Sequence, residues 1–309
     1  MIYTLTMNPA IDFNITGKNI KKNFVNRTWD PVYTPNGKGV NVSLVLKHFN
    51  RDSVVMGFFG GFSGKYIIDE LKKSNILVSP VWVDDITRIN IFLNDGADEY
   101  KFVNKGAFVS QNKQKKLLQN LQNLTDCEYL SISGSLPLGI EENFYDKIAN
   151  ICSQKNIKLI LDISSPKLKD LLKYKPFLIK PNDDEIKTIF NYDITSDETA
   201  IIVLNKLVQA GAQNILLTLG EKGAYFTDGT TVYFSSTQKI KLLSSACAGD
   251  SALAAFLSEF LYGKNIENAL KKSAATGANV AESNAIGTLD KVAIYSKNIN
   301  VIKKGLITI

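Results

Sequence analysis

Histidine is almost absent from this sequence, since His48 is the only one in 309 residues. Its scarcity argues against a histidine-based catalytic triad and against a metal site with two or more histidine ligands. Cysteine is also scarce: Cys127, Cys152 and Cys247 are far apart and odd in number. That usage fits a reducing cytoplasm without a disulfide framework. Any chemistry is therefore expected from carboxylates, lysines, arginines and backbone amides.

Long apolar runs are missing too, and no stretch is long enough to cross a membrane. Residues 1–6 lack a basic region followed by an apolar stretch, so no signal peptide is expected. The formal charge of +6 is modest, and the lysines are scattered. This pattern is typical of a solvated surface rather than a nucleic-acid-binding face. We expect a cytoplasmic protein with no membrane and no nucleic-acid partner, whose mild positive field suits phosphorylated substrates.

Short apolar runs alternate with helical patterns along the chain. The predicted strands are residues 2–6, 54–59, 129–133, 159–162, 177–179 and 215–219, and the predicted helices are 40–49, 64–74, 111–124, 142–154 and 198–210. This alternation predicts an α/β fold with βαβ units and a mostly parallel sheet covered on both faces. No linker divides the chain, so one domain is expected over residues 1–309.

Two segments, residues 12–34 and 88–103, look instead like strands that alternate polar and apolar side chains. In residues 88–93 the period is two, so Arg88 and Asn90 share one face. One interpretation is a small lid sheet whose apolar face pairs with a second copy of the chain. The other is an ordinary edge hairpin, and both stay open.

A loop of small residues leads into an apolar helix at Cys247, Ala248, Gly249 and Asp250. Backbone amides at such a helix start, with its partial positive charge, suit a phosphoryl group in transfer. Asp250 is either the carboxylate that takes a proton from an attacking hydroxyl or an ordinary acidic residue of the first turn.

Three more segments carry polar groups next to predicted strands or helices. The glycine-rich segment with Gly37, Lys38 and Asn41 has the wrong spacing for a Walker loop, but its lysine and asparagine can bind a sugar or its phosphate. Residues 133–137 and 180–185 follow predicted strands, and ligands of open α/β sheets bind at the carboxyl ends of strands. Asn182 and Glu185 are either a capping box or the holders of a hydrated magnesium ion.

Six ordered segments, residues 6–12, 36–41, 60–61, 87–90, 133–137 and 248–250, resemble the ribokinase-like sugar kinases of the phosphofructokinase-B branch. The resemblance covers essentially the whole chain and is greatest to the 1-phosphofructokinases and the tagatose-6-phosphate kinases. It implies a three-layer sandwich with a central, mostly parallel sheet. It also implies that residues 12–34 and 88–103 form a lid inserted in the single domain.

The resemblance also implies a role for each matching residue. Asp250 matches the catalytic base, and the amides of Ala248, Gly249 and Asp250 match an anion hole that begins after Cys247. The residues that match substrate ligands are Asp12, Gly37, Lys38, Asn41, Arg88, Asn90 and Ser135, of which Arg88 and Ser135 face the phosphate. The residues that match nucleotide ligands are Lys180, Asn182, Glu185, Thr218, Gly220 and Gly223. Asn182 and Glu185 would hold Mg²⁺ through water.

The activity implied is phosphoryl transfer from ATP with Mg²⁺ to fructose 1-phosphate, which gives fructose 1,6-bisphosphate. Tagatose-6-phosphate kinase and fructose-6-phosphate 1-kinase remain alternatives, because the same groups serve a sugar turned end for end. A sugar-phosphate-binding regulator with little catalysis is the alternative from another class. A homodimer formed through the lid is a further expectation from the resemblance.

Two positions depart from the usual family pattern. Cys247 stands where the catalytic loop usually has glycine, and a positive φ there would add strain of roughly 1–2 kcal/mol. Asn36 replaces the first glycine of the sugar loop, a milder change because asparagine tolerates left-handed backbone. We therefore expect an altered anion hole rather than an abolished one.

Overall fold

A mostly parallel sheet forms the centre of the computed structural model, which describes residues 1–263 and 265–307. Within these residues the sheet has ten strands in the order β14-β13-β12-β11-β10-β9-β8-β1-β4-β5. The strands are β1 (Ile2–Thr6), β4 (Ser53–Gly60), β5 (Leu77–Val83), β8 (Tyr129–Ser133), β9 (Lys158–Asp162), β10 (Leu178–Ile179), β11 (Asn214–Thr218), β12 (Ala224–Thr227), β13 (Thr231–Ser235) and β14 (Val301–Leu306). Neighbouring strands from β5 to β11 are parallel, and those from β11 to β14 are antiparallel.

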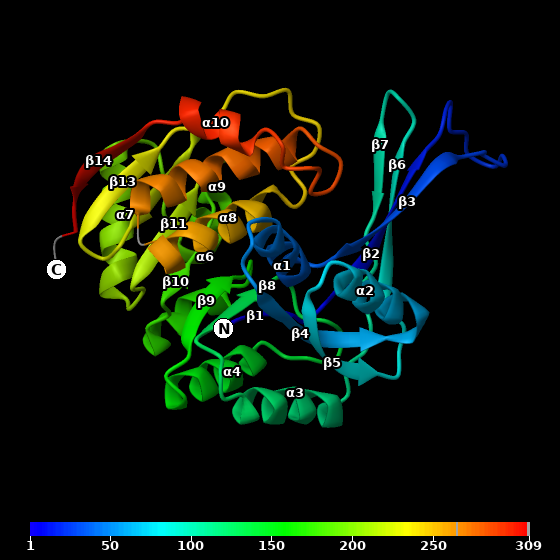
Figure 1. Ribbon diagram of the computed structural model, residues 1–309, viewed down its shortest axis with the longest axis horizontal. Helices are drawn as coiled ribbons and strands as arrows, with labels where there is room; N and C mark the ends of the chain where they lie inside the picture. The colour runs from blue at the N-terminus through cyan, green and yellow to red at the C-terminus, as the bar shows by residue number, and fades with distance from the viewer. Residues whose placement is uncertain (264, 308–309) are drawn as a thin grey trace.

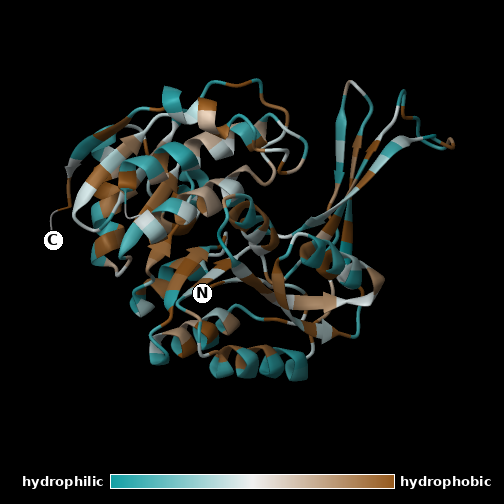
Figure 2. Ribbon diagram, viewed as in Figure 1, coloured by the Kyte–Doolittle hydropathy of each residue, from teal (hydrophilic) through white to brown (hydrophobic). Residues whose placement is uncertain are grey.

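Helices cover both faces of this sheet (Figure 1). They are α1 (Lys38–His48), α2 (Gly61–Lys73), α3 (Gln111–Asn123), α4 (Asn143–Gln154), α5 (Lys167–Leu171), α6 (Asp183–Phe190), α7 (Asp197–Gln209), α8 (Ala248–Gly263), α9 (Ile266–Ala281) and α10 (Val292–Asn298), with 3-10 turns at Leu172–Tyr174 and Gly220–Lys222. Alternate side chains of β4 enter different cores: Met56 packs with α3 and α4, whereas Val55 packs with α2. The predicted three-layer α/β fold is confirmed, with hydrophobic residues gathered on the strands and the inner helix faces (Figure 2).

A second sheet projects from this body, and its four strands run in the order β3-β2-β6-β7 (Figure 1). Its strands are β2 (Ala10–Thr16), β3 (Trp29–Asn36), β6 (Arg88–Asn94) and β7 (Glu99–Phe102). The small sheet expected from residues 12–34 and 88–103 is therefore present. Exposed large apolar side chains lie on its strands at Val32, Tyr33 and Phe102 and in the connection between β2 and β3 at Phe24 and Val25. These support the homodimer expected through this sheet, which remains a prediction.

Several elements differ from the sequence-based expectation. Strand β5 and the antiparallel strands β12 to β14 were not predicted. β5 and β14 are the edge strands of the sheet and have exposed and half-buried positions, and β12 and β13 are runs of only four and five residues. Helix α1 begins at Lys38, two residues before its predicted start. Apolar periodicity does not reveal a first helical turn, whose side chains face a ligand cavity instead of the core. No helix in the described ranges is long and apolar enough to span a bilayer.

Strand β1 places the two sheets against each other. It lies between β4 and β8, and only three residues separate its end at Thr6 from β2. The carboxyl ends of β1, β8 and β9 consequently open toward the base of the small sheet. In open α/β sheets ligands bind at this edge.

Candidate active site

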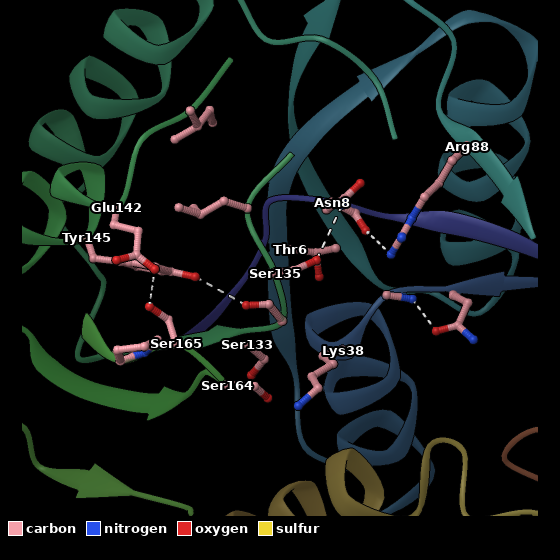
Figure 3. Close-up of a pocket in the computed structure, with 16 residues that line it drawn as sticks. Thr6, Asn8, Lys38, Arg88, Ser133, Ser135, Glu142, Tyr145, Ser164 and Ser165 are labelled. Atoms are coloured by element: carbon pink, nitrogen blue, oxygen red, sulfur yellow. Dashed lines mark hydrogen bonds between the residues drawn. The ribbon is translucent and has the colours of Figure 1, made fainter. Parts of the chain in front are cut away.

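A cavity of about 560 Å³ lies at the carboxyl ends of β1, β8 and β9. Arg88 and Asn8 line one end of it, and Glu142, Tyr145 and Ser165 line the other (Figure 3). Further lining residues are Thr6, Asn36, Gly37, Lys38, Ser133, Gly134, Ser135, Leu136, Ile140, Ser164 and Pro166. Its walls are rich in hydroxyls, with a cation on two sides, which suits a phosphorylated polyol.

Two buried hydroxyls form the floor of this cavity. Thr6 and Ser133 are partners on the adjacent strands β1 and β8, and both are almost fully buried. Neither side-chain oxygen has a hydrogen-bond partner among the described residues. Because an unpaired buried hydroxyl is costly, these two groups are suited to bond a polar ligand.

The glycine-rich segment before α1 packs directly on the end of β1. Gly37 has a φ of 134°, and a Cβ there would lie 2.6 Å from Thr6 Cγ2. A Cβ at Gly39 would lie 2.4 Å from Thr6 Oγ1. Side chains are therefore excluded at both positions, and the first turn of α1 is held against the cavity. This contact brings Lys38 to the cavity wall and Asn41 just behind it.

The helix α8 opens with amides that are free to bind an anion. The amide of Ala248 donates to the Ser245 carbonyl at 3.4 Å, whereas those of Gly249 and Asp250 have no acceptor in the described parts of the chain. Cys247 precedes them with a φ of 63°. The left-handed backbone expected to strain this cysteine is thus present, and the amides after it remain available.

Asp250 is buried at this helix start and is 6% exposed. Its Oδ2 accepts a hydrogen bond of 2.9 Å from the side-chain amide of Asn41. Burial raises the pKa of Asp250 to about 6, and the negative charge of Asp162 adds to the rise, while Lys38 and Asn41 oppose it. A carboxylate with such a pKa is ionised at neutral pH and is basic enough to accept a proton from a hydroxyl.

A buried cluster of charges lies beside Asp250. Asp162, at the end of β9, pairs with Lys180 Nζ at 3.0 Å and with Lys38 Nζ at 3.6 Å. Burial alone would raise the pKa of Asp162, yet the two ammonium groups hold it below its usual value. Lys180 Nζ also lies 3.5 Å from where a Cβ would stand on Gly249. Two lysines thus flank the amides of α8, where negative charge would collect.

Asp12 and Arg88 extend the site onto the small sheet. Asp12 is 7% exposed, and its two oxygens accept side-chain amides from Asn90, at 2.8 Å, and from Asn36. Burial raises the pKa of Asp12, and these amides and Arg88 moderate the rise. The Arg88 guanidinium donates to the carbonyls of Asn104 and Asn8. Since a guanidinium has five N–H groups, Arg88 keeps donors for a ligand anion.

The capping box expected at Asn182 and Glu185 is present. The Glu185 amide donates to Asn182 Oδ1 at 2.7 Å, and the Asn182 amide donates to Glu185 Oε2 at 3.0 Å. Ser164 donates to the other carboxylate oxygen at 2.5 Å. Each of these oxygens keeps a lone pair for a further hydrogen bond, and Mg²⁺ usually retains several of its waters, so the two residues can hold a hydrated Mg²⁺ through water. Among the described residues no three acidic, cysteine or histidine side chains form a direct metal site.

The remaining nucleotide candidates lie along the next strand. Thr218, at the end of β11, bridges to Asn182, so these two residues are adjacent. Gly220 has a φ of 57°, and no atom lies within 4 Å of where its Cβ would be, so its face is open to a ligand. Gly223 differs, because a Cβ there would lie 2.2 Å from the Ser235 carbonyl oxygen. The packing of β13 is enough to account for that glycine.

The expected residues come together only in part. Gly37, Lys38, Arg88 and Ser135 line the cavity directly. Outside its lining lie the other expected sugar ligands (Asp12, Asn41 and Asn90), the expected base Asp250 and the expected nucleotide-binding residues. Asn36 lies at the cavity wall and contacts both Asp12 and Asn41, so it stands between the cavity and the buried carboxylates.

Asp162 and the Thr6 hydroxyl were not identified from the sequence as groups of the site, whereas Ser133 was included in the expected segment 133–137. Asp162 closes a predicted strand at residues 159–162, and Ser133 closes another at residues 129–133. A polar residue that ends a buried parallel strand was the available signal, since these ends converge in space. Asn36 was noted in the sequence as a substitution and was not expected to contact other side chains of the site.

Comparisons with known proteins agree over nearly the whole chain. The sequence pattern described as "pfkB family carbohydrate kinase" matches residues 2–291. The chain is 47% identical to the D-tagatose-1-phosphate kinase of Klebsiella oxytoca over 303 residues, covering 98% of this chain and 100% of that protein. It is 35% identical to the 1-phosphofructokinase of Bacillus subtilis over 288 residues, or 93% and 95% of the two chains. The structure of Escherichia coli phosphofructokinase-2 with substrates and products matches with a TM-score of 0.87 at 25% identity. The match covers 96% of this chain and 98% of that chain.

Proposed function

This chain belongs to the pfkB family of carbohydrate kinases, and we propose that it transfers the γ-phosphoryl group of ATP to the free primary hydroxyl of a ketohexose 1-phosphate. The expectation of a sugar phosphate kinase, from the group of 1-phosphofructokinases and tagatose-phosphate kinases, is confirmed. Which sugar phosphate it uses is part of the proposal.

One observation carries the proposed chemistry: a buried carboxylate with a raised pKa lies at the start of a helix whose amides are free. Asp250 is 6% exposed, and two lysines that pair with Asp162 lie close to it. General base and anion site are therefore neighbours. Phosphoryl transfer asks mainly for such positioning and charge stabilisation.

The chain's own groups divide the work as follows. Asp250 would take the proton of the attacking hydroxyl as the oxygen bonds to phosphorus. The amides of Gly249 and Asp250, with Lys38 and Lys180, would stabilise the negative charge on the transferred group. Bound Mg²⁺ would neutralise phosphate charge, and Asn182 and Glu185 would hold it through its waters. Arg88 would anchor the phosphate that the sugar already carries.

Two ketohexose 1-phosphates fit this proposal, and they differ only in the configuration at C4. Tagatose 1-phosphate takes first place, because the relatives from Klebsiella oxytoca and Bacillus licheniformis, 47% and 38% identical, are both named D-tagatose-1-phosphate kinases. Fructose 1-phosphate, the substrate expected from the sequence, takes second place on the 35% identical 1-phosphofructokinase. Tagatose 1-phosphate is not one of the substrates that the sequence alone predicts.

The test is a coupled assay of ADP release with five acceptors. These are tagatose 1-phosphate, fructose 1-phosphate, tagatose 6-phosphate, fructose 6-phosphate and fructose. We expect kcat/KM to be highest for the two 1-phosphates and lowest for unphosphorylated fructose. A preference for either 6-phosphate would reverse the proposed direction of the sugar, and no turnover with any of the five would reject the proposed function.

The pH dependence follows from the environment of Asp250. Its pKa is raised to about 6, and only the ionised form accepts a proton. We therefore expect kcat/KM to fall as the pH drops below about 6, while the rate stays level above neutrality. The sugar phosphate itself also titrates near this pH, so its binding to an Asp250→Asn variant should be followed by calorimetry over the same range. If binding to that variant accounts for the whole decline, Asp250 is not the titrating group.

A further inference from the structure

The side chain of Asn36, at the end of β3, makes four contacts within the site. Its amide nitrogen donates to Asp12 Oδ2 and, at 3.8 Å, to the sulfur of Cys247. Its carbonyl oxygen accepts from the amide of Gly37 and, at 3.1 Å, from the side-chain amide of Asn41. A primary amide has two donors and two lone pairs, so Asn36 uses all of them.

These contacts join the two carboxylates of the site into one hydrogen-bonded chain. The chain runs from Asp12 through Asn36 and Asn41 to Asp250. Its ends belong to different parts of the fold, since Asp12 lies on the small sheet and Asp250 opens α8. An ionised carboxylate only accepts, so the two ends fix which way each amide faces.

The sulfur of Cys247 completes this arrangement. It accepts from Asn36 at 3.8 Å. At 3.4 Å it also shares the side-chain amide of Asn41 with Asn36 Oδ1 and Asp250 Oδ2, because that amide has only two N–H groups for three acceptors. Glycine would suit the φ of 63° at this position better, yet it would bring no acceptor to the two amides. Burial, with the nearby charge of Asp250, raises the pKa of Cys247 to about 12, so its thiol stays protonated. The cysteine therefore serves as a hydrogen-bond acceptor and not as a nucleophile.

The backbone gives no other reason for an asparagine at residue 36. The left-handed conformation in this loop belongs to Gly37, whereas Asn36 is not among the residues with positive φ. The tolerance of asparagine for left-handed backbone, expected to matter here, is thus not used. What distinguishes Asn36 is its amide group.

We infer that Asn36, with Cys247 as a shared acceptor, is a positioning residue that orients the sugar-binding carboxylate Asp12 and the base Asp250 together. The inference rests on the proposed function. Sugar binding at Asp12 is thereby coupled, through Asn36 and Asn41, to the orientation and ionisation of the base Asp250. Removing the Asn36 amide loosens Asp12. It also leaves the Asn41 amide, which favours the ionised form of Asp250, less firmly oriented.

The groups that face these carboxylates fix the sign of the pH effect. Asp250 faces Asp162 of β9, Lys38 of α1, Lys180 after β10 and the thiol of Cys247. Asp12 faces Arg88 of β6 and the same Cys247 thiol. None of them is changed in an Asn36→Gly variant. Weaker support from Asn41 disfavours ionised Asp250, so the acid limb of kcat should move to higher pH.

The experiment compares Asn36→Gly, Cys247→Ala, the double variant and Asn94→Ala. Asn94 is a matched control on β6, since the hydrogen bond of its side chain within the described residues is the one it accepts from the Gly96 amide in a turn. In Asn36→Gly we expect KM for the sugar phosphate to rise and kcat to fall, each by about fivefold to tenfold, as for one lost hydrogen bond. KM for ATP should stay unchanged, and so should every constant of Asn94→Ala.

The double variant tests the shared contact. If Asn36 and Cys247 act through the same set of hydrogen bonds, the loss of activity in the double variant should be smaller than the product of the two single losses. Cys247→Ser, which keeps an acceptor, should recover activity relative to Cys247→Ala. Independent effects, or an Asn36→Gly variant with unchanged KM and pH profile, would overturn the inference. A wild-type protein that turns over none of the five acceptors would instead reject the proposed function.

Discussion

Replacement of Asp250 by asparagine should lower kcat by about 10²–10⁴-fold, the usual contribution of a general base. The change keeps the shape of the side chain and its contact with Asn41 but removes the proton acceptor. We expect the Kd values for ATP and the sugar phosphate to stay within about threefold of wild type, because uncharged asparagine keeps the site packed. Rapid-quench measurement of a single turnover, with calorimetry for both ligands, checks this. Turnover within tenfold of wild type would remove Asp250 from the role of base.

The same variant should also be more stable to heat at neutral pH. The folded-state pKa of Asp250, about 6, lies above its usual value of 3.8. Its contribution to stability is therefore full below pH 3.8 and is lost as the pH rises through 6. Asparagine avoids that loss, so Tm should be higher than wild type at pH 8 and similar near pH 4. If the variant has a lower Tm than wild type at pH 8, the ionised carboxylate of Asp250 does not destabilise the folded protein.

Replacement of Arg88 by alanine should raise KM for the sugar phosphate by roughly 10-fold to 100-fold, since hydrogen bonds to charged groups contribute about 1.5–3 kcal/mol. Arg88 lines the cavity and keeps free donors besides its bonds to the carbonyls of Asn8 and Asn104. KM for ATP should hardly change, because the expected nucleotide residues lie on other strands. Initial-rate kinetics with each substrate varied in turn measures both constants.

Arg51 provides the matched control for this prediction. Its guanidinium also donates to a main-chain carbonyl, that of Ser258, and it stacks on Tyr262 at 3.9 Å, outside the cavity lining. Arg51→Ala should leave both KM values unchanged. Wild type and Arg88→Ala should use unphosphorylated fructose equally poorly, because fructose has no phosphate group for Arg88 to bind. If Arg88→Ala raises KM for ATP instead of KM for the sugar phosphate, the phosphate of the sugar binds elsewhere.

Three features of the site could be predicted from the local sequence. The glycine at residue 37 and the helix start at Ala248 were recognisable because the backbone at each place requires small residues. The capping box of Asn182 and Glu185 was equally readable, since its partners are three residues apart. In each case the interacting groups are close in sequence. The matching of ordered segments then placed the whole chain in its family.

The contacts of Asn36 show where that reach ends. Its partners Asp12, Asn41 and Cys247 lie 24, 5 and 211 residues away, and the two substitutions noted separately in the sequence turn out to touch. Asp162 is similar, because its charge partners come from elsewhere in the chain, Lys38 from α1 and Lys180 from the loop after β10. No local periodicity encodes which polar groups meet at the edge of a sheet.

The amino-acid sequence by itself determined the α/β alternation, the small second sheet, the family and the identity of Asp250 as the candidate base. These depend on period, on backbone demands and on segments that can be read in order. Tertiary structure decided which side chains share the cavity, how the pKa of Asp250 is raised and which amides connect it to Asp12. Burial and Coulomb interactions act through space between residues far apart in the chain, so they arise only once the strands have been ordered in the sheet.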